Sequence, residues 1–164
     1  MKLFFGNYFL VLCVVYSNCL FAQEGGTGFK KSHFYAVMAG KNEEEINQQL
    51  GLLQSAAPAE RNAYEGALLM KKAGMATAPK KKLNLFKEGH KKLEAVLQKD
   101  STNTEFRFLR LMIQEHAPGA LGYKKDLERD NLYIRNNFKK LSPVVQDAVI
   151  DYSKTSKILK LGNL

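Results

Sequence analysis

The chain has 164 residues, of which 45% are hydrophobic, and its 25 basic and 16 acidic side chains give a formal net charge of +9. Both cysteines, Cys13 and Cys19, lie in the apolar N-terminal segment, which excludes disulfides, thiolate catalysis and cysteine metal ligands from the rest of the chain. The remaining length suits one domain with a packed core and is short for two.

Residues 1–22 have the pattern of a secretory signal peptide. Lys2 is followed by an apolar run at 10–15 and by a small-residue end at Ala22, which predicts cleavage after that residue. An uncleaved membrane anchor is disfavoured because the run is shorter than about 18 residues and polar side chains interrupt it. Lipidation at Cys19 is the minor alternative. We therefore expect an exported protein, either periplasmic or secreted.

Residues 23–32 combine glycines with lysines and offer little to bury, so we expect a flexible leader ahead of a single domain at 33–164. A short first helix is predicted at 33–39, with Gly40 as its C-cap. The next helix is predicted to start at Asn42. The side chain of this residue can accept hydrogen bonds from free amides, and the three glutamates that follow it favour the positive end of the helix dipole.

Two longer helices follow in the sequence. The first is predicted within 56–74, where Pro58 stands near its start, and a turn at 73–79 ends it. The second, at 81–99, has the clearest amphipathic pattern in the chain. Its apolar face contains Phe86, Gly89, Leu93, Val96 and Leu97.

The helix that starts near Thr104 is predicted to be the central element, because apolar residues between Phe106 and Ile113 cover most of its circumference. Its polar residues are spaced so that they fall within about 60° of one another. We call this set the polar stripe: Asn103, Arg107, Arg110 and Gln114. The stripe either presents guanidinium groups to a carboxylate in a groove or pairs structurally with acids such as Glu115, Asp126 or Glu128.

A Pro/Gly corner at 116–123 is predicted to reverse the chain into two final amphipathic helices. The first runs from about 124 to 141. The second starts at Ser142 and Pro143, as N-cap and first helical residue, and its buried side is expected to contain Val145, Val149, Tyr152 and Leu159. No segment alternates apolar and polar residues. The predicted fold class is therefore all-α, with six or seven helices in an antiparallel helical-hairpin array or bundle.

Nearly all of the positive charge belongs to residues 71–99, which hold nine basic and two acidic side chains. Such a surface attracts polyanions without specifying them, and in an exported protein these are anionic lipid or acidic polysaccharide; no specific nucleic acid is expected. The alternative is that the lysines only solvate a helix face. The candidate polyanion-binding residues are Lys71, Lys72, Lys80, Lys81, Lys82, Lys87, Lys91 and Lys92.

The segment FKEGHKKLEAVLQKDSTNTEFRFLRLMI is similar to the second helix of a tetratricopeptide-type repeat, its turn and the opening helix of the next repeat. Gly89 falls at the small packing position of the repeat. Asp100 and Asn103 match its Asp-Pro-x-Asn turn, with serine in place of proline. With AYEGALLMKKAG as the first helix, the resemblance covers 63–113. It implies helical hairpins that bind partners through a concave surface.

The pattern F-R-F-L-R-L…Q-E…P…L-G-Y-K…L-E-x-D, between Glu105 and Ile134, resembles small exported helical proteins of Bacteroidetes-type bacteria. This resemblance implies an exported helical protein and supplies no catalytic residues.

No recognisable catalytic pattern is present. The three histidines, His33, His90 and His116, are widely spaced, and the sequence contains no HExxH motif, Gly-rich phosphate loop or nucleophile elbow. We therefore expect no enzymatic activity, no cofactor and no metal, with an uncharacterised hydrolase as a remote alternative.

The main hypothesis is an interaction or scaffold protein of the bacterial cell envelope, whose partner, another envelope protein, contacts the polar stripe. The alternative is a basic-face binder of polyanions or of an anionic membrane surface. The sequence leaves the oligomeric state open.

Overall fold

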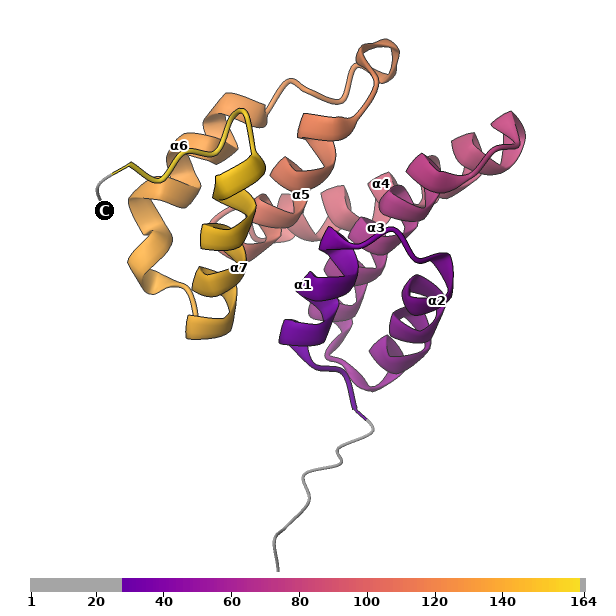
Figure 1. Cartoon of the computed structure of the whole chain (residues 1–164), viewed down its shortest axis with the longest axis horizontal. Helices are drawn as coiled ribbons and strands as arrows, with labels where there is room; N and C mark the ends of the chain where they lie inside the picture. Colours follow the sequence, from indigo (N-terminus) through magenta and orange to yellow (C-terminus); the bar gives the residue numbers. More distant parts are fainter. Residues whose placement is uncertain (1–27, 163–164) are drawn as a thin grey trace, which may run out of the picture.

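The computed structural model describes residues 28–162, and within this range its regular secondary structure is entirely helical, with no strand (Figure 1). The predicted fold class is thus confirmed, whereas the predicted signal peptide lies outside the described residues. The α-helices are α1 (Lys31–Ala39), α2 (Glu43–Leu52), α3 (Pro58–Met75), α4 (Pro79–Lys99), α5 (Thr104–His116), α6 (Leu127–Asn137) and α7 (Pro143–Thr155). Single 3-10 turns follow as η1 (Leu53–Ser55), η2 (Gly119–Leu121) and η3 (Phe138–Lys140).

Local sequence signals explain where several helices start. Proline occupies the first helical position of α3, α4 and α7, where its missing N–H costs nothing. Asn42 Oδ1 accepts from the Glu44 N–H at 2.9 Å, and Asn103 Oδ1 accepts from the Phe106 N–H at 3.0 Å. Ser142 is the N-cap of α7, but its side chain makes no capping hydrogen bond.

The first helix begins earlier than predicted. α1 starts at Lys31, and the ring of Phe29 lies 4.9 Å from that of Tyr64 and 5.9 Å from that of Phe34. The expectation of a flexible leader at 23–32 is therefore wrong at its C-terminal end. An aromatic side chain that packs on the core fixes the chain just before α1.

The last two helices are shorter than predicted. Residues before Leu127 form a turn, and η3 replaces the last turn of the predicted helix at 124–141. α7 ends at Thr155, so Leu159 is buried but does not belong to the helix. The Ser156 hydroxyl accepts from the Leu159 N–H at 2.8 Å, which turns the chain and lets Leu159 reach the core from a non-helical tail.

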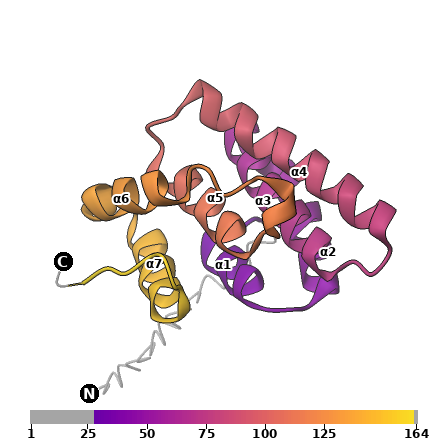
Figure 2. The same cartoon turned by 90° about the horizontal axis from the view of Figure 1, so that it is seen from above.

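α5 lies at the centre of the molecule, as predicted (Figures 1 and 2). It contacts α3, α4 and α6, while α2 packs on α3 and α1 packs on α2. α6 and α7 complete the fold beyond α5, and α7 also contacts α1. Because it is enclosed from several sides, α5 can be apolar over most of its circumference.

α3 and α4 form a long antiparallel pair that crosses at two glycines. A Cβ atom on Gly66 would lie 2.8 Å from the Gly89 carbonyl oxygen, and one on Gly89 would lie 2.5 Å from the Gly66 carbonyl oxygen. No side chain fits at this crossing, so both positions require glycine for the backbones to approach this closely.

Glu105, in the first turn of α5, ties the N-terminal helices to the central one. Its carboxylate accepts hydrogen bonds from the Tyr35 hydroxyl at 2.9 Å, the Tyr64 hydroxyl at 2.5 Å and the Lys31 ammonium group at 2.8 Å. Burial and the nearby carboxylate raise the pKa of both tyrosines. The two hydroxyls therefore remain protonated donors at neutral pH.

Glu115, near the end of α5, ties the C-terminal tail in the same manner. It accepts from the Tyr152 hydroxyl at 2.7 Å, the Ser156 hydroxyl at 2.6 Å and the Lys157 N–H at 2.6 Å. Burial alone would raise the pKa of Glu115, but these hydrogen bonds and the nearby His116 outweigh burial and lower it.

We expect Glu115→Gln to lower the free energy of unfolding by about 1–3 kcal/mol at pH 7, because it removes a charged acceptor of three hydrogen bonds. A lowered pKa in the folded state stabilises the fold at pH values above the unfolded pKa of about 4.3, and this stabilisation disappears as the pH falls through the folded pKa. Urea unfolding at pH 7 and pH 3 should therefore show a difference from wild type that shrinks at low pH. Glu128→Gln, at an exposed site, is the control; equal effects of both variants would contradict the assignment.

Candidate binding site

The polar stripe of α5 does not form an open surface. Arg107 and Arg110 are 8% and 5% exposed, and Gln114 is fully buried. Asn103 caps the start of α5. Three of the four predicted residues thus lie in the interior, between α5 and the elements packed on it.

Asp130 of α6 holds both arginines. Its carboxylate is fully buried and accepts from Arg107 Nη1 at 2.7 Å. The same carboxylate accepts from Arg110 Nε at 2.6 Å and from Arg110 Nη2 at 2.9 Å, which is a two-point contact. One acid therefore neutralises half of the charge of a positive pair that would otherwise be costly to bury.

A second layer of acids completes the environment of Arg110. Glu94 of α4 accepts from Arg110 Nη1 at 3.0 Å and from the Tyr123 hydroxyl at 2.7 Å, and Asp126 lies 3.5 Å from Arg110 Nη1. Burial alone would lower the pKa of Arg110, but its bonds to Asp130 and these acids raise it. Burial and Glu94 raise the pKa of Tyr123, so its hydroxyl stays a donor.

Above this ion-pair network a pocket opens among the end of α4, α5 and the start of α6. Its volume is about 470 Å³, and we call it the α4–α6 pocket. Four cationic and two acidic side chains are among the lining residues, which are Glu94, Leu97, Gln98, Ser101, Arg107, Arg110, Lys125, Asp126 and Arg129. A polar, net basic pocket of this kind suits an anionic group.

Hydrogen-bond donors in the α4–α6 pocket remain available, whereas its acids are already occupied. Glu94 accepts from Tyr123 and Arg110, and Asp126 accepts from Arg129 at 2.5 Å. Within the described residues, the Lys125 side chain has no hydrogen-bond or ion-pair partner, and Arg129 is 64% exposed. Arg107 Nε and Nη1 are paired, with the Ser101 carbonyl and Asp130, and Nη2 has no partner within the same range.

The structure brings Arg107 and Arg110 together in the pocket and leaves Asn103 and Gln114 outside its lining. Of the predicted acidic partners, only Asp126 contacts an arginine of the stripe. Glu115 binds the tail instead, and Glu128 is exposed. Gln114 carries an amide group whose two polar atoms are buried without a hydrogen-bond partner among the described residues.

Sequence reasoning missed Asp130 and Glu94 as partners of Arg110. Asp130 lies three residues after Leu127 and four before Ile134, which is the spacing of the apolar face of α6. A lone acid on that face was the available signal, because a buried carboxylate requires a cationic partner.

Four of the eight candidate lysines are near a carboxylate or half-buried, and the other four are exposed. Lys72 and Lys81 each lie 3.5 Å from Glu43, and Lys92 lies 3.2 Å from Glu65. Lys71 is half-buried. Burial is the main cause that lowers its pKa, and repulsion from Lys41 lowers it further. The other four are exposed on α4 and have no carboxylate partner among the described residues: Lys80, Lys82, Lys87 and Lys91.

The histidines do not form a common site. His90 packs against the rings of Phe86 and Tyr123, and His116 Nε2 lies 3.4 Å from the Tyr152 hydroxyl. Over residues 28–162, no group of three or more histidine, cysteine, aspartate or glutamate side chains is placed to hold a metal ion. None of the helices in this range is long and apolar enough to cross a membrane.

Comparison of the chain with protein-family models, with curated proteins and with solved structures finds no match.

Proposed function

We propose that this chain is an exported, non-catalytic interaction module of a bacterial cell envelope, and that the α4–α6 pocket holds an acidic segment of a partner protein. The observation that carries the proposal is that the pocket offers unpaired hydrogen-bond donors, while the charged groups at its bottom are already paired with one another. The acids of the pocket are bound to Tyr123, Arg110 and Arg129, while Lys125 and Arg107 Nη2 retain donors for a ligand.

The floor of the pocket supports recognition in a second way. Asp130 fixes Arg110 at two points, and the Arg107 guanidinium group stacks over the Tyr133 ring at 4.3 Å. Arginines held in one orientation lose little conformational entropy when a carboxylate binds. The donors therefore meet an acidic group without rearranging.

The helical-hairpin character of the chain also supports an interaction module. Gly89, at the small packing position of the tetratricopeptide-type resemblance, meets Gly66 of the preceding helix where α3 and α4 cross. Repeats of that kind bind partner segments on their concave surfaces.

The test is a charge reversal at the exposed rim of the pocket. We expect Lys125→Glu/Arg129→Glu to weaken binding of a fluorescent glutamate-rich peptide more than about tenfold, because two favourable contacts become repulsive. Fluorescence anisotropy at low and moderate salt measures this affinity. In cells, cross-linking of the tagged protein should yield an envelope protein that the rim variant no longer captures.

The matched control is Arg135→Glu/Lys139→Glu, which makes the same charge change at exposed sites outside the pocket. It should retain peptide binding within about threefold, since long-range charge effects are screened beyond about 10 Å at ordinary salt. If rim and control variants lose binding equally, the pocket is not the site.

A further inference from the structure

The far end of the α3–α4 hairpin projects from the body of the molecule (Figures 1 and 2). We call this end, with Lys80, Lys81, Lys82, Leu83 and Lys87, the basic tip. Three consecutive lysines occupy the first turn of α4, which contains no acidic residue. Cations are unfavourable at this end of a helix because the macrodipole is positive there. The sequence thus places charge where folding alone does not favour it.

Lysines of the basic tip lack the close carboxylate partners that several lysines on the body of the protein have. Lys31, Lys92 and Lys154 each lie within 3.2 Å of a carboxylate. Within the described residues, Lys80, Lys82 and Lys87 have no such partner, and Lys81 has only a 3.5 Å contact with Glu43. The positive charge of the tip is therefore free to meet an external anion.

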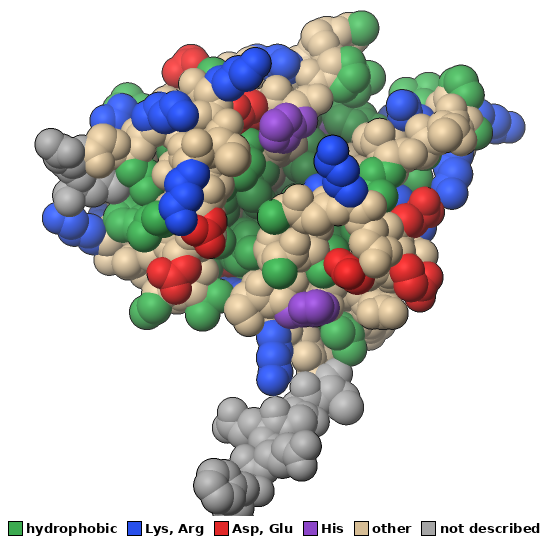
Figure 3. All heavy atoms as spheres, in the orientation of Figure 1, with side chains coloured by type: hydrophobic (Ala, Val, Ile, Leu, Met, Phe, Trp, Pro, Cys, Tyr) green, Lys and Arg blue, Asp and Glu red, His purple; other side chains and the backbone are tan. Residues whose placement is uncertain are grey.

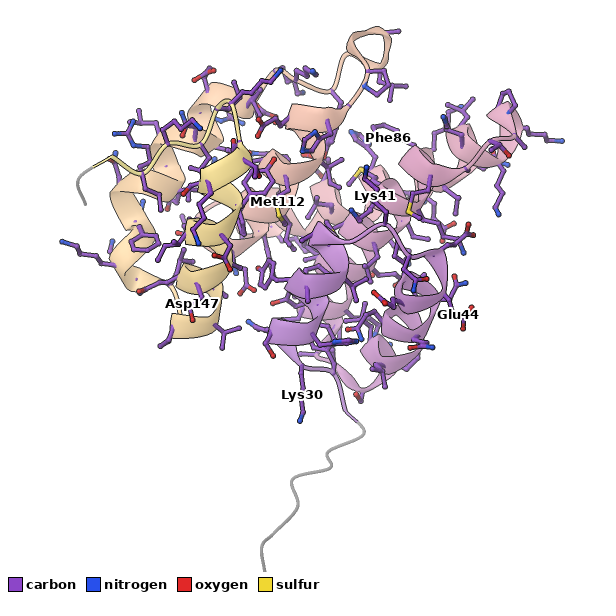
Figure 4. All side chains as sticks on the ribbon, viewed as in Figure 1. Lys30, Lys41, Glu44, Phe86, Met112 and Asp147 are labelled. Carbon is purple, nitrogen blue, oxygen red and sulfur yellow. The ribbon has the colours of Figure 1, made fainter. Side chains whose placement is uncertain are left out.

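Apolar side chains are exposed on the same side of the molecule. Leu83 is 43% exposed, and Leu121, in η2, is 39% exposed. The Phe86 ring lies 5.5 Å from the Tyr123 ring. Phe86 follows Leu83 by about one helical turn and Tyr123 follows Leu121 by two residues, so this contact joins the two exposed regions. The η2 corner and the basic tip project toward the same side, and Figure 3 shows apolar surface in the hollow between them. Figure 4 places Phe86 in that hollow.

We propose that the basic tip and the η2 corner dock on an anionic lipid bilayer, with Leu83 and Leu121 entering the headgroup region and the tip lysines contacting lipid phosphates. Two projections give two points of contact and so restrict the orientation of the domain. Of the glutamates at the start of α2, Glu44 points away from the tip (Figure 4), whereas Glu43 lies 3.5 Å from Lys81 and offsets part of the charge of that lysine.

A bilayer explains both halves of this surface, whereas a soluble polyanion explains only one. Lysines bind phosphate or sulfate groups of either ligand. Exposed leucines gain binding free energy only where an apolar phase receives them, and the headgroup and acyl boundary of a bilayer does so. The joint presence of Leu83 and the unpaired lysines thus favours lipid.

The experiment is co-sedimentation of the purified protein with vesicles of phosphatidylcholine alone or with about one third phosphatidylglycerol. Wild type should bind only the anionic vesicles. Lys80→Gln/Lys82→Gln/Lys87→Gln should reduce the partition coefficient by about 100-fold, since each lysine near an anionic surface contributes about fivefold. Leu83→Ser should reduce it by about tenfold.

Matched controls separate docking from general charge. Lys139→Gln/Lys140→Gln/Lys160→Gln removes the same charge far from the basic tip and should retain binding within about threefold. Leu132→Ser changes a leucine that is 59% exposed on α6 and should have no effect. Thermal unfolding checks that all variants are folded.

Heparin affinity distinguishes the alternatives. We expect Leu83→Ser to leave heparin binding unchanged while weakening vesicle binding. If Leu83→Ser leaves vesicle binding intact but the lysine variant abolishes it, the surface binds soluble polyanions and the bilayer proposal is wrong. An equal loss in the distant lysine control would show attraction by net charge alone, which also overturns it.

Discussion

Asp130→Asn should destabilise the domain by about 3–5 kcal/mol, because it leaves Arg107 and Arg110 in the interior without their main counter-charge. The new asparagine amide would also place its N–H donors against the N–H donors of the two guanidinium groups, where no hydrogen bond can form. Asp130 is fully buried and accepts three hydrogen bonds at 2.6–2.9 Å, so solvent cannot replace it. Small domains have a total stability of about 5–15 kcal/mol, and the thermal midpoint should fall by roughly 10 °C or more.

Asp151→Asn is the matched control for this prediction. Asp151 pairs with Lys154 at 2.7 Å, but both side chains are mostly exposed, at 73% and 66%. Its loss should change stability by less than about 1 kcal/mol. A double-mutant cycle of Asp130→Asn with Arg110→Gln should show a coupling energy of about 1–3 kcal/mol. Additive effects would mean that the buried contact contributes little.

Gly89→Ala should destabilise the domain by about 1–3 kcal/mol, even though alanine favours a helix over glycine by about 1 kcal/mol. The added methyl group would lie 2.5 Å from the Gly66 carbonyl oxygen and 2.8 Å from Met70 Cγ. The backbone oxygen cannot move aside without separating α3 from α4. Urea unfolding measures the loss.

Gly74→Ala tests the same substitution where space is free. Gly74 lies in α3, and nothing stands within 4 Å of a Cβ atom built on it. This variant should be more stable than wild type by about 0.5–1 kcal/mol. If the free energy of unfolding falls for Gly89→Ala and rises for Gly74→Ala, the loss at Gly89 is due to the helix crossing. A Gly89→Ala variant that is more stable than wild type would exclude a tight crossing.

Features determined by nearby residues could be predicted from the sequence. The capping by Asn42 and the start of α3 and α7 at proline depend on contacts within one helical turn. The predicted start of α4 is two residues too late, because Pro79 is predicted to belong to a turn and is the first residue of the helix. The central place of α5 followed from its nearly continuous apolar surface. These elements gave the correct fold class.

The site depended on contacts that periodicity does not specify. The stripe of α5 could be located, but its pairing with Asp130 requires the register of α6 on α5, across 20 residues of sequence. Leu159 illustrates the same limit, because helical spacing placed it on α7 and the turn at Ser156 brings it to the core by another route. Long-range packing determines both the Arg110–Asp130 pairing and the position of Leu159.

The two glutamates of α5 also bear on how the domain unfolds. Glu105 is bonded to α1 and α3, Glu115 is bonded to the C-terminal tail, and α7 contacts α1 directly. In open repeat arrays each unit contacts only its neighbours, so the ends can fray independently. Here both ends of the described chain are fastened to one helix of 13 residues. Loss of either end removes contacts that hold the other, which makes the transition cooperative.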